Sequence, residues 1–68
     1  MSVRIRLNGE DRQFASSLTI SKMLEETGYD PKYVAVAINY DCIRKDVFDT
    51  REINEGDEVE IVSPQAGG

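Results

Sequence analysis

The sequence predicts a small α+β domain, in which one main helix packs on one face of a mixed sheet of four to five strands. Three observations lead to this prediction: alternating apolar residues near both ends of the chain, one amphipathic helical pattern between them, and turn signals that separate the segments. The 68 residues allow one compact core and leave no room for a second. We therefore expect one domain over residues 1–63, followed by a flexible tail over residues 64–68.

A β-hairpin is predicted at the start of the chain. Apolar residues alternate with arginines over residues 3–7, which is the period of two expected for a strand with one buried face. A turn at residues 8–11 contains Asn and Gly, which tolerate positive φ. The chain is then expected to return as a second strand over residues 12–15, with Phe14 directed into the core.

One amphipathic helix is predicted next. Between residues 20 and 27 the core-facing positions are spaced i, i+3, i+4 and i+7, and charged residues occupy the other faces. Thr19 can accept a hydrogen bond from an unpaired backbone N–H at the helix start, and Gly28 can adopt the left-handed conformation that ends the helix. The Asp30-Pro31 pair prevents its continuation.

The middle of the chain is expected to supply the core strand. Residues 34–38 form an unbroken apolar run, which favours a central strand covered on both faces over an edge strand with one wet face. Residues 42–43 are assigned to a short extended piece. Residues 46–53 are polar and are expected to be mostly irregular.

A last strand is predicted around Val59 and Ile61, which alternate with glutamates after a turn at residues 54–57. The resulting order is strand, strand, helix, strand, short strand, strand. This order is typical of the ubiquitin-like β-grasp fold, whereas a ferredoxin-like domain would require a second helix.

Composition excludes several classes of function. With 8 basic and 13 acidic residues the net charge is −5, which disfavours nucleic acid as a partner. The chain has no His and one Cys, Cys42, so it can form neither an internal disulfide nor a zinc site alone. We expect Cys42 to be a core or half-buried residue without a chemical role. A lone Cys suits a reducing compartment and no apolar run resembles a signal peptide or membrane anchor, so the expected location is cytoplasmic and away from membranes.

The feature most suggestive of chemistry is the pair Gly67-Gly68. Without Cβ atoms these residues can pass through a channel too narrow for side chains and present a carboxylate to the active site of another protein. The alternative interpretation is a frayed chain end without function. General acid–base catalysis by this chain is not expected, because a domain of this size lacks a deep substrate cleft.

Several motifs together resemble one known family. They are the Leu7-Asn8-Gly9 hairpin, Leu18-Thr19-Ile20 at the helix start, the apolar run that ends in Asn39, Cys42-Ile43-Arg44-Lys45, the closing segment over residues 55–62 and Gly67-Gly68. With these motifs the chain resembles the ThiS family, the ubiquitin-like sulfur carriers of thiamine thiazole biosynthesis, and more distantly MoaD, the small subunit of molybdopterin synthase. Residues 39–41 are expected to form a turn, and there the chain differs from the family pattern, because Tyr40 stands where a Gly is common.

The resemblance implies a carrier, not an enzyme. A ThiF-like adenylating enzyme, similar to ubiquitin E1, would adenylate the Gly68 carboxylate, and a sulfur donor such as a cysteine desulfurase would supply the sulfur of a thiocarboxylate. A ThiG-like thiazole synthase would then receive that sulfur. The chain itself would bind no cofactor, while ATP, Mg²⁺ and any Zn²⁺ would belong to the activating enzyme.

Other functions stay open on the sequence alone. A MoaD-type carrier for molybdopterin, tRNA thiolation or another acceptor would differ only in the acceptor. A ubiquitin-like modifier would form isopeptide bonds to lysines, and a plain β-grasp interaction module would carry the two glycines without using them.

A docking surface for the activating enzyme is predicted on the last strand. Glu58, Glu60 and Val62 adjoin the tail and combine negative charge with one apolar side chain. They also belong to an acidic stretch between Asp46 and Glu60 that contains seven acidic residues and a single Arg. The partner is therefore expected to present a basic surface.

Overall fold

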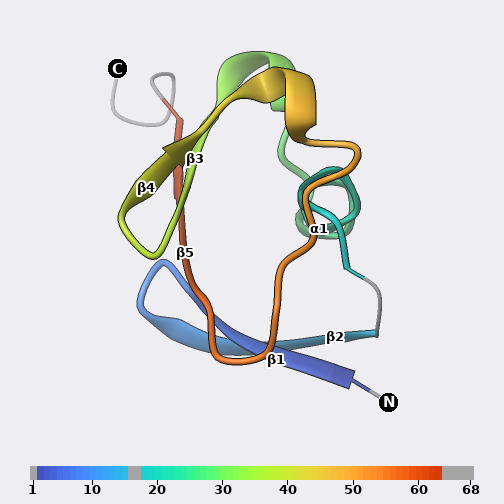
Figure 1. Cartoon of the computed structure of the whole chain (residues 1–68), viewed down its shortest axis with the longest axis vertical. Helices are drawn as coiled ribbons and strands as arrows, with labels where there is room; N and C mark the ends of the chain where they lie inside the picture. Colours follow the sequence, from blue (N-terminus) through green and yellow to red (C-terminus); the bar gives the residue numbers. More distant parts are fainter. Residues whose placement is uncertain (1, 16–17, 64–68) are drawn as a thin grey trace.

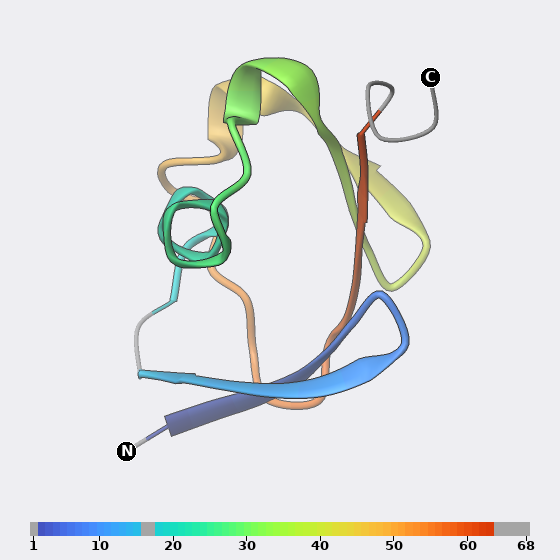
Figure 2. The same ribbon diagram turned by 180° about the vertical axis from the view of Figure 1, so that it is seen from behind.

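The computed structural model describes residues 2–15 and 18–63, which form a twisted sheet with a helix against one of its faces (Figures 1 and 2). Within these residues, five strands join in the order β2-β1-β5-β3-β4. The strands are β1 (Ser2–Leu7), β2 (Glu10–Ala15), β3 (Ala35–Ile38), β4 (Asp41–Ile43) and β5 (Glu58–Val62). The sheet is mixed, because β5 pairs in parallel with β1 and antiparallel with β3. Gly67, Gly68 and the rest of the predicted tail over residues 64–68 lie outside the described residues, so that tail stays a prediction.

The hairpin of β1 and β2 closes through a two-residue turn. Asn8 has φ 50° and Gly9 has φ 83°, which is the conformation that matches the twist of the flanking strands. Because two residues are enough for this turn, β2 starts at Glu10, earlier than the predicted residue 12. The hairpin directs Leu7 and Phe14 into the core, as predicted for Phe14.

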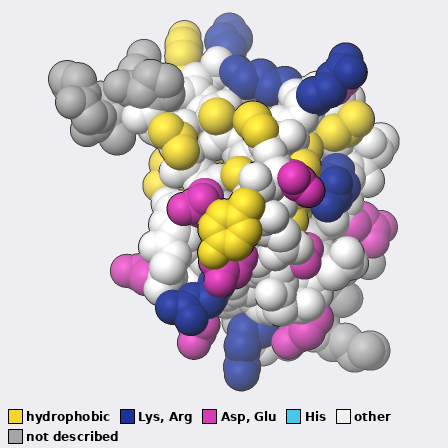
Figure 3. Space-filling model, turned by 60° about the vertical axis from the view of Figure 1, so that its left-hand side comes forward, with side chains coloured by type: hydrophobic (Ala, Val, Ile, Leu, Met, Phe, Trp, Pro, Cys, Tyr) yellow, Lys and Arg dark blue, Asp and Glu magenta, His cyan; other side chains and the backbone are white. Residues whose placement is uncertain are grey.

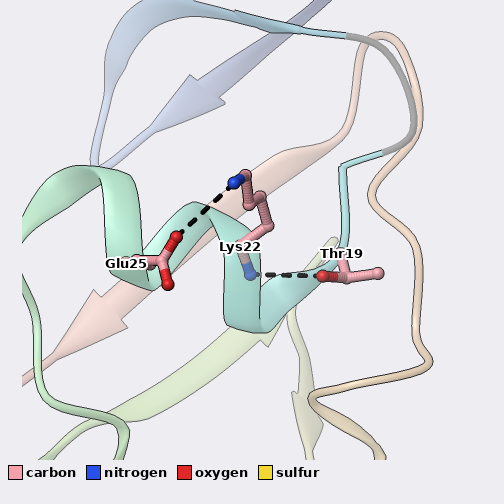
Figure 4. Close-up of polar contacts among 3 residues, drawn as sticks. All are labelled: Thr19, Lys22 and Glu25. Carbon is pink, nitrogen blue, oxygen red and sulfur yellow. Dashed lines mark hydrogen bonds and ion pairs between the residues drawn. The ribbon is translucent and has the colours of Figure 1, made fainter.

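The predicted helix and both of its end signals are confirmed. Helix α1 covers Ile20–Thr27, and the Oγ1 of Thr19 accepts a hydrogen bond from the N–H of Lys22 at 3.2 Å (Figure 4). At the other end Gly28 has φ 86°, and its N–H donates to the carbonyl of Leu24 at 2.9 Å.

Burial, more than charge, holds α1 in place. The ion pair between Lys22 and Glu25 spans 3.5 Å at the surface (Figure 4) and contributes at most about 0.5 kcal/mol. Three side chains of the opposite helix face, Ile20, Met23 and Leu24, are instead fully buried. Each such side chain contributes about 1.5–3 kcal/mol through removal of apolar surface from water.

The segment between β4 and β5 is mostly irregular, as predicted, but it contributes to the core. It begins with a 3₁₀ turn over Lys45–Val47 and then buries the side chains of Phe48 and Ile53. The carbonyl of Phe48 accepts from the N–H of Ser21 at 2.9 Å, and the N–H of Ile53 donates to the carbonyl of Leu18 at 2.8 Å. The segment is therefore anchored to the start of the helix.

The prediction that residues 34–38 form a strand covered on both faces was wrong, although β3 is an interior strand and not an edge strand, as predicted. Val36 and Ile38 are buried, but Ala35 is exposed and Ala37 is only half-buried. The central strand of the sheet is β5. An alanine methyl group costs little when it is exposed, so alanines at alternate positions conceal the period of two in an apolar run.

The core lies between α1 and the inner face of the sheet. Its buried side chains are those of Ile5, Leu7, Phe14, Leu18, Ile20, Met23, Leu24, Val34, Val36, Ile38, Phe48, Ile53, Val59 and Ile61. No helix in residues 2–15 and 18–63 has the length and apolar composition needed to cross a membrane.

Candidate functional site

The predicted docking residues Glu58, Glu60 and Val62 all lie on the outer side of β5. Their side chains are exposed, whereas Val59 and Ile61 between them point into the core. Val62 has 61% of its surface exposed, which is unusual for a valine in the central strand of a sheet. The helix covers the other face of this sheet (Figure 1), so this side of β5 is open to a partner.

Strands β3 and β4 extend this surface. Ala37 lies opposite Glu60 on β5 and opposite Cys42 on β4, and Ala35 lies opposite Val62. We use the name "open face" for the surface formed by Ala35, Ala37, Tyr40, Cys42, Glu58, Glu60 and Val62. Figure 3 views the molecule from this side and shows hydrophobic side chains close to acidic ones. Such a combination is typical of an interface with a small apolar centre and a charged rim.

The expectation that Cys42 is a core or half-buried residue was wrong. Its side chain is exposed on β4, which is an edge strand. The next residue, Ile43, is the one that packs against the core, and the period of two then directs Cys42 outward. A strand of three residues was too short for this alternation to be read from the sequence.

Two asparagine side chains hold β5 in its position. The Oδ1 atom of Asn8 accepts from the N–H of Ile61 at 2.8 Å, and the Oδ1 atom of Asn39 accepts from the N–H of Glu58 at 3.0 Å. Both asparagines have positive φ in hairpin turns. Sequence alone places both asparagines only in turns, because these side-chain bonds join residues that are far apart in the chain. They fix the strand that leads to residues 64–68.

Two of the acidic residues near the open face have structural roles. The carboxylate of Asp57 accepts from the Nδ2 of Asn39 at 3.1 Å and from the N–H of Asn54 at 2.8 Å. Glu55 accepts from the N–H of Arg4 at 2.8 Å. These bonds shape the turn before β5. The carboxylates of β5 that a partner can contact are therefore mainly those of Glu58 and Glu60.

The described surface offers contacts for a partner and no metal-binding cluster. In the described segments, no group of three or more His, Cys, Asp or Glu side chains is arranged to hold a metal ion. The open face can bind a partner through shape, apolar contact and charge.

The family model of ThiS matches residues 5–68. The chain belongs to the ThiS family. The sulfur carrier protein ThiS of Thermus thermophilus is 37% identical over 62 residues, which are 91% of this chain and 95% of that protein. The solved structure of the thiamine biosynthesis protein ThiS from Geobacter metallireducens superimposes with a TM-score of 0.82 at 25% identity, over 97% of this chain and 100% of the other. This likeness confirms the predicted β-grasp fold of this ThiS-family chain.

A third relative is much longer than this ThiS-family chain. A thiazole synthase of Paramagnetospirillum magneticum is 36% identical over 66 residues, which are 97% of this chain. The chain spans only 20% of the length of that relative. A ThiS-like region thus occurs within a protein that bears the name of a synthase.

Proposed function

We propose that this chain is a sulfur carrier of thiamine thiazole biosynthesis and that its reacting group is the carboxylate of Gly68. The observation that carries the proposal is the family match, which runs from residue 5 through residue 68 and so includes Gly67 and Gly68. The domain places a fixed central strand ahead of these residues and an open face beside that strand. A cytoplasmic location is part of the proposal.

The proposed chemistry takes place in the active site of an E1-like adenylating enzyme. The Gly68 carboxylate attacks the α-phosphate of ATP, and pyrophosphate leaves. A persulfide sulfur, delivered from a donor such as a cysteine desulfurase, attacks the acyl carbon and displaces AMP. A thiol then cleaves the S–S bond of the acyl disulfide, which leaves a thiocarboxylate on Gly68 and a disulfide on the donor side. ATP and its Mg²⁺, and any Zn²⁺, are bound by the enzyme and not by the carrier.

The proposed receiver of the sulfur is a thiazole synthase. The ThiS-like region within a protein named thiazole synthase supports this proposal, since joining two partners in one chain raises their effective concentration. In this scheme the carrier contributes the open face and the Gly67-Gly68 pair, while the two enzymes contribute the catalytic groups. The carrier is therefore not itself an enzyme.

Intact-mass spectrometry of the protein from its native host tests the proposed function. Replacement of one carboxylate oxygen by sulfur should raise the mass by about 16 Da. Oxidation of Met23 or Cys42 adds nearly the same mass, so fragmentation must place the change on Gly68. Cells grown without thiamine should contain the modified form. Its absence from such cells would contradict the proposal, and conjugates to lysines on denaturing gels would favour the ubiquitin-like modifier.

Reversal of the charges on β5 should slow activation. The double variant Glu58→Lys and Glu60→Lys removes the negative potential that steers a basic partner, so the association rate at low salt should fall about tenfold or more. The dependence of that rate on salt should also weaken. Stopped-flow binding to the adenylating enzyme measures both quantities.

The matched control is the double variant Glu25→Lys and Glu26→Lys, which makes the same change in charge at two exposed positions of α1, away from the open face. Its association rate should stay within about twofold of the unmodified protein, because exposed charges beyond a Debye length are screened. Equal slowing by both variants would show that net charge matters and that the position on β5 does not.

A further inference from the structure

Tyr40 is the most exposed of the large apolar side chains in the described residues. It lies in the turn between β3 and β4, and 80% of its surface is in contact with solvent. Its φ is 71°, in the left-handed region that bulky side chains rarely adopt. The side chain therefore buries almost no surface in the domain, while its backbone is strained. Neither property helps the fold.

The turn that carries Tyr40 is hydrogen-bonded to the start of β5 through both the backbone and the side chain of Asn39. The N–H of Asn39 donates to the carbonyl of Glu58 at 2.7 Å, and the side chain of Asn39 bonds both Glu58 and Asp57. These bonds over-determine the turn, which is the condition under which a strained residue persists. The Tyr40 hydroxyl also lies 3.4 Å from the Oε2 of Glu58. A preorganised aromatic side chain loses little entropy on binding and makes a good anchor for a partner.

The surroundings of the Tyr40 ring are acidic. Asp41 follows it in the chain, Glu58 contacts its hydroxyl, and Glu60 lies further along β5. Arg6 is opposite Glu58 in the sheet register, but its guanidinium is directed to its own hairpin, where it donates to the carbonyl of Gly9 at 3.3 Å. A cation is favoured over an anion or a purely apolar group at this position, because it interacts with both the ring face and the carboxylates.

We propose that Tyr40 is a specificity-determining contact of this carrier, and that it receives an arginine side chain of the adenylating enzyme. The guanidinium would stack on the Tyr40 ring and pair with the Glu58 carboxylate. Arginine fits better than lysine, since its planar group can stack on a ring and bond a carboxylate at the same time. The inference rests on the proposed function, and it names the chemistry by which the partner of the open face is recognised.

Variants at Tyr40 separate a role in binding from a role in folding. Tyr40→Gly relieves the positive φ and removes the ring, so the melting temperature should be unchanged or higher. The KM of the adenylating enzyme for the carrier should rise about 3- to 30-fold in ATP–pyrophosphate exchange, with kcat unchanged. Tyr40→Phe keeps the ring and should raise KM by no more than about threefold. Tyr40→Leu keeps apolar bulk without a π face and should behave like Tyr40→Gly.

The outcomes distinguish this inference from the proposed function. If the unmodified carrier supports no exchange at all, the proposed function fails. If it supports exchange and Tyr40→Gly has an unchanged KM, only the role of Tyr40 fails. Full affinity in Tyr40→Leu would show that the ring receives an apolar group. If the variants weakened binding to the thiazole synthase alone, Tyr40 would contact the synthase and not the adenylating enzyme, and the proposed contact would be wrong. A melting temperature lowered in Tyr40→Gly by more than about 5 °C would show that Tyr40 stabilises the fold.

A double-mutant cycle then identifies the proposed arginine. Each surface arginine of the adenylating enzyme is changed to alanine and tested against the unmodified carrier and Tyr40→Leu. For one arginine, the two changes together should raise KM by clearly less than the product of their separate effects. Multiplicative effects at every arginine would overturn the proposed contact.

Discussion

Deletion of Gly68 should abolish adenylation and leave the stability of the domain unchanged. The deletion shortens the arm by about 3.5 Å, far more than the roughly 1 Å misplacement that can cost a hundredfold in rate. Gly67→Ala should also be severely impaired, because its Cβ restricts the backbone where the chain must enter the adenylating enzyme. Glycine has no side chain to contribute to a core, so the free energy of unfolding should change by no more than about 0.5 kcal/mol.

The measurement is ATP–pyrophosphate exchange with the cognate adenylating enzyme, run beside thermal melts of each variant. Gln65→Ala is the matched control, since it changes a neighbouring side chain but keeps both the length and the glycine pair. It should retain most of the exchange activity. Full activity of the Gly68 deletion would show that the glycine pair is not used, and the sulfur-carrier proposal would fail with it.

Phe48→Ala should produce the largest loss of stability among the changes considered. Phe48 is 3% exposed and lies in the irregular segment that is anchored to the start of α1. Truncation of a buried Phe to Ala costs about 3–5 kcal/mol through lost burial and a residual cavity. A domain of this size has a total stability of about 3–10 kcal/mol. The melting temperature should therefore fall by more than about 10 °C, and part of the protein should be unfolded at 37 °C.

Val47→Ala is the control for Phe48→Ala in a circular-dichroism melt. Val47 is the preceding residue and has 37% of its surface exposed, so its truncation should cost less than about 1 kcal/mol. Equal destabilisation by the two variants would show that the buried ring of Phe48 contributes no more to stability than the partly exposed side chain of Val47. A small effect of Phe48→Ala would mean that the core repacks around the missing ring.

The parts of the fold that were predicted correctly are those whose signals are local. The Asn8-Gly9 turn, the Thr19 cap and the Gly28 helix end each depend on conformations that a few neighbouring residues determine. The core role of Phe48 and Ile53 was missed, because their segment is polar and lacks periodicity. The position of this segment depends on tertiary contacts with the start of α1 and not on a local sequence pattern.

Only the part of the candidate site that lies on β5 could be predicted, because its signal is local and that of Tyr40 and Cys42 is not. The alternation along β5 correctly indicated that Glu58, Glu60 and Val62 share one face, and the structure shows that this face is the exposed one. The sequence could not show that Tyr40 shares this surface, because the side-chain bonds of Asn39 to β5 join residues that are distant in the chain. The exposure of Cys42 likewise depends on the edge position of its strand.

The central position of β5 has a consequence for protein synthesis. The hairpins β1–β2 and β3–β4 are local, but they join into one sheet only through β5, where Asn8 bonds Ile61 across 53 positions of sequence. Because the ribosome makes β5 after every other strand described here, a nascent chain that stops before β5 lacks the strand that joins the two hairpins. A partner that contacts β3, β4 and β5 together would therefore find its complete surface only after β5 has joined the sheet.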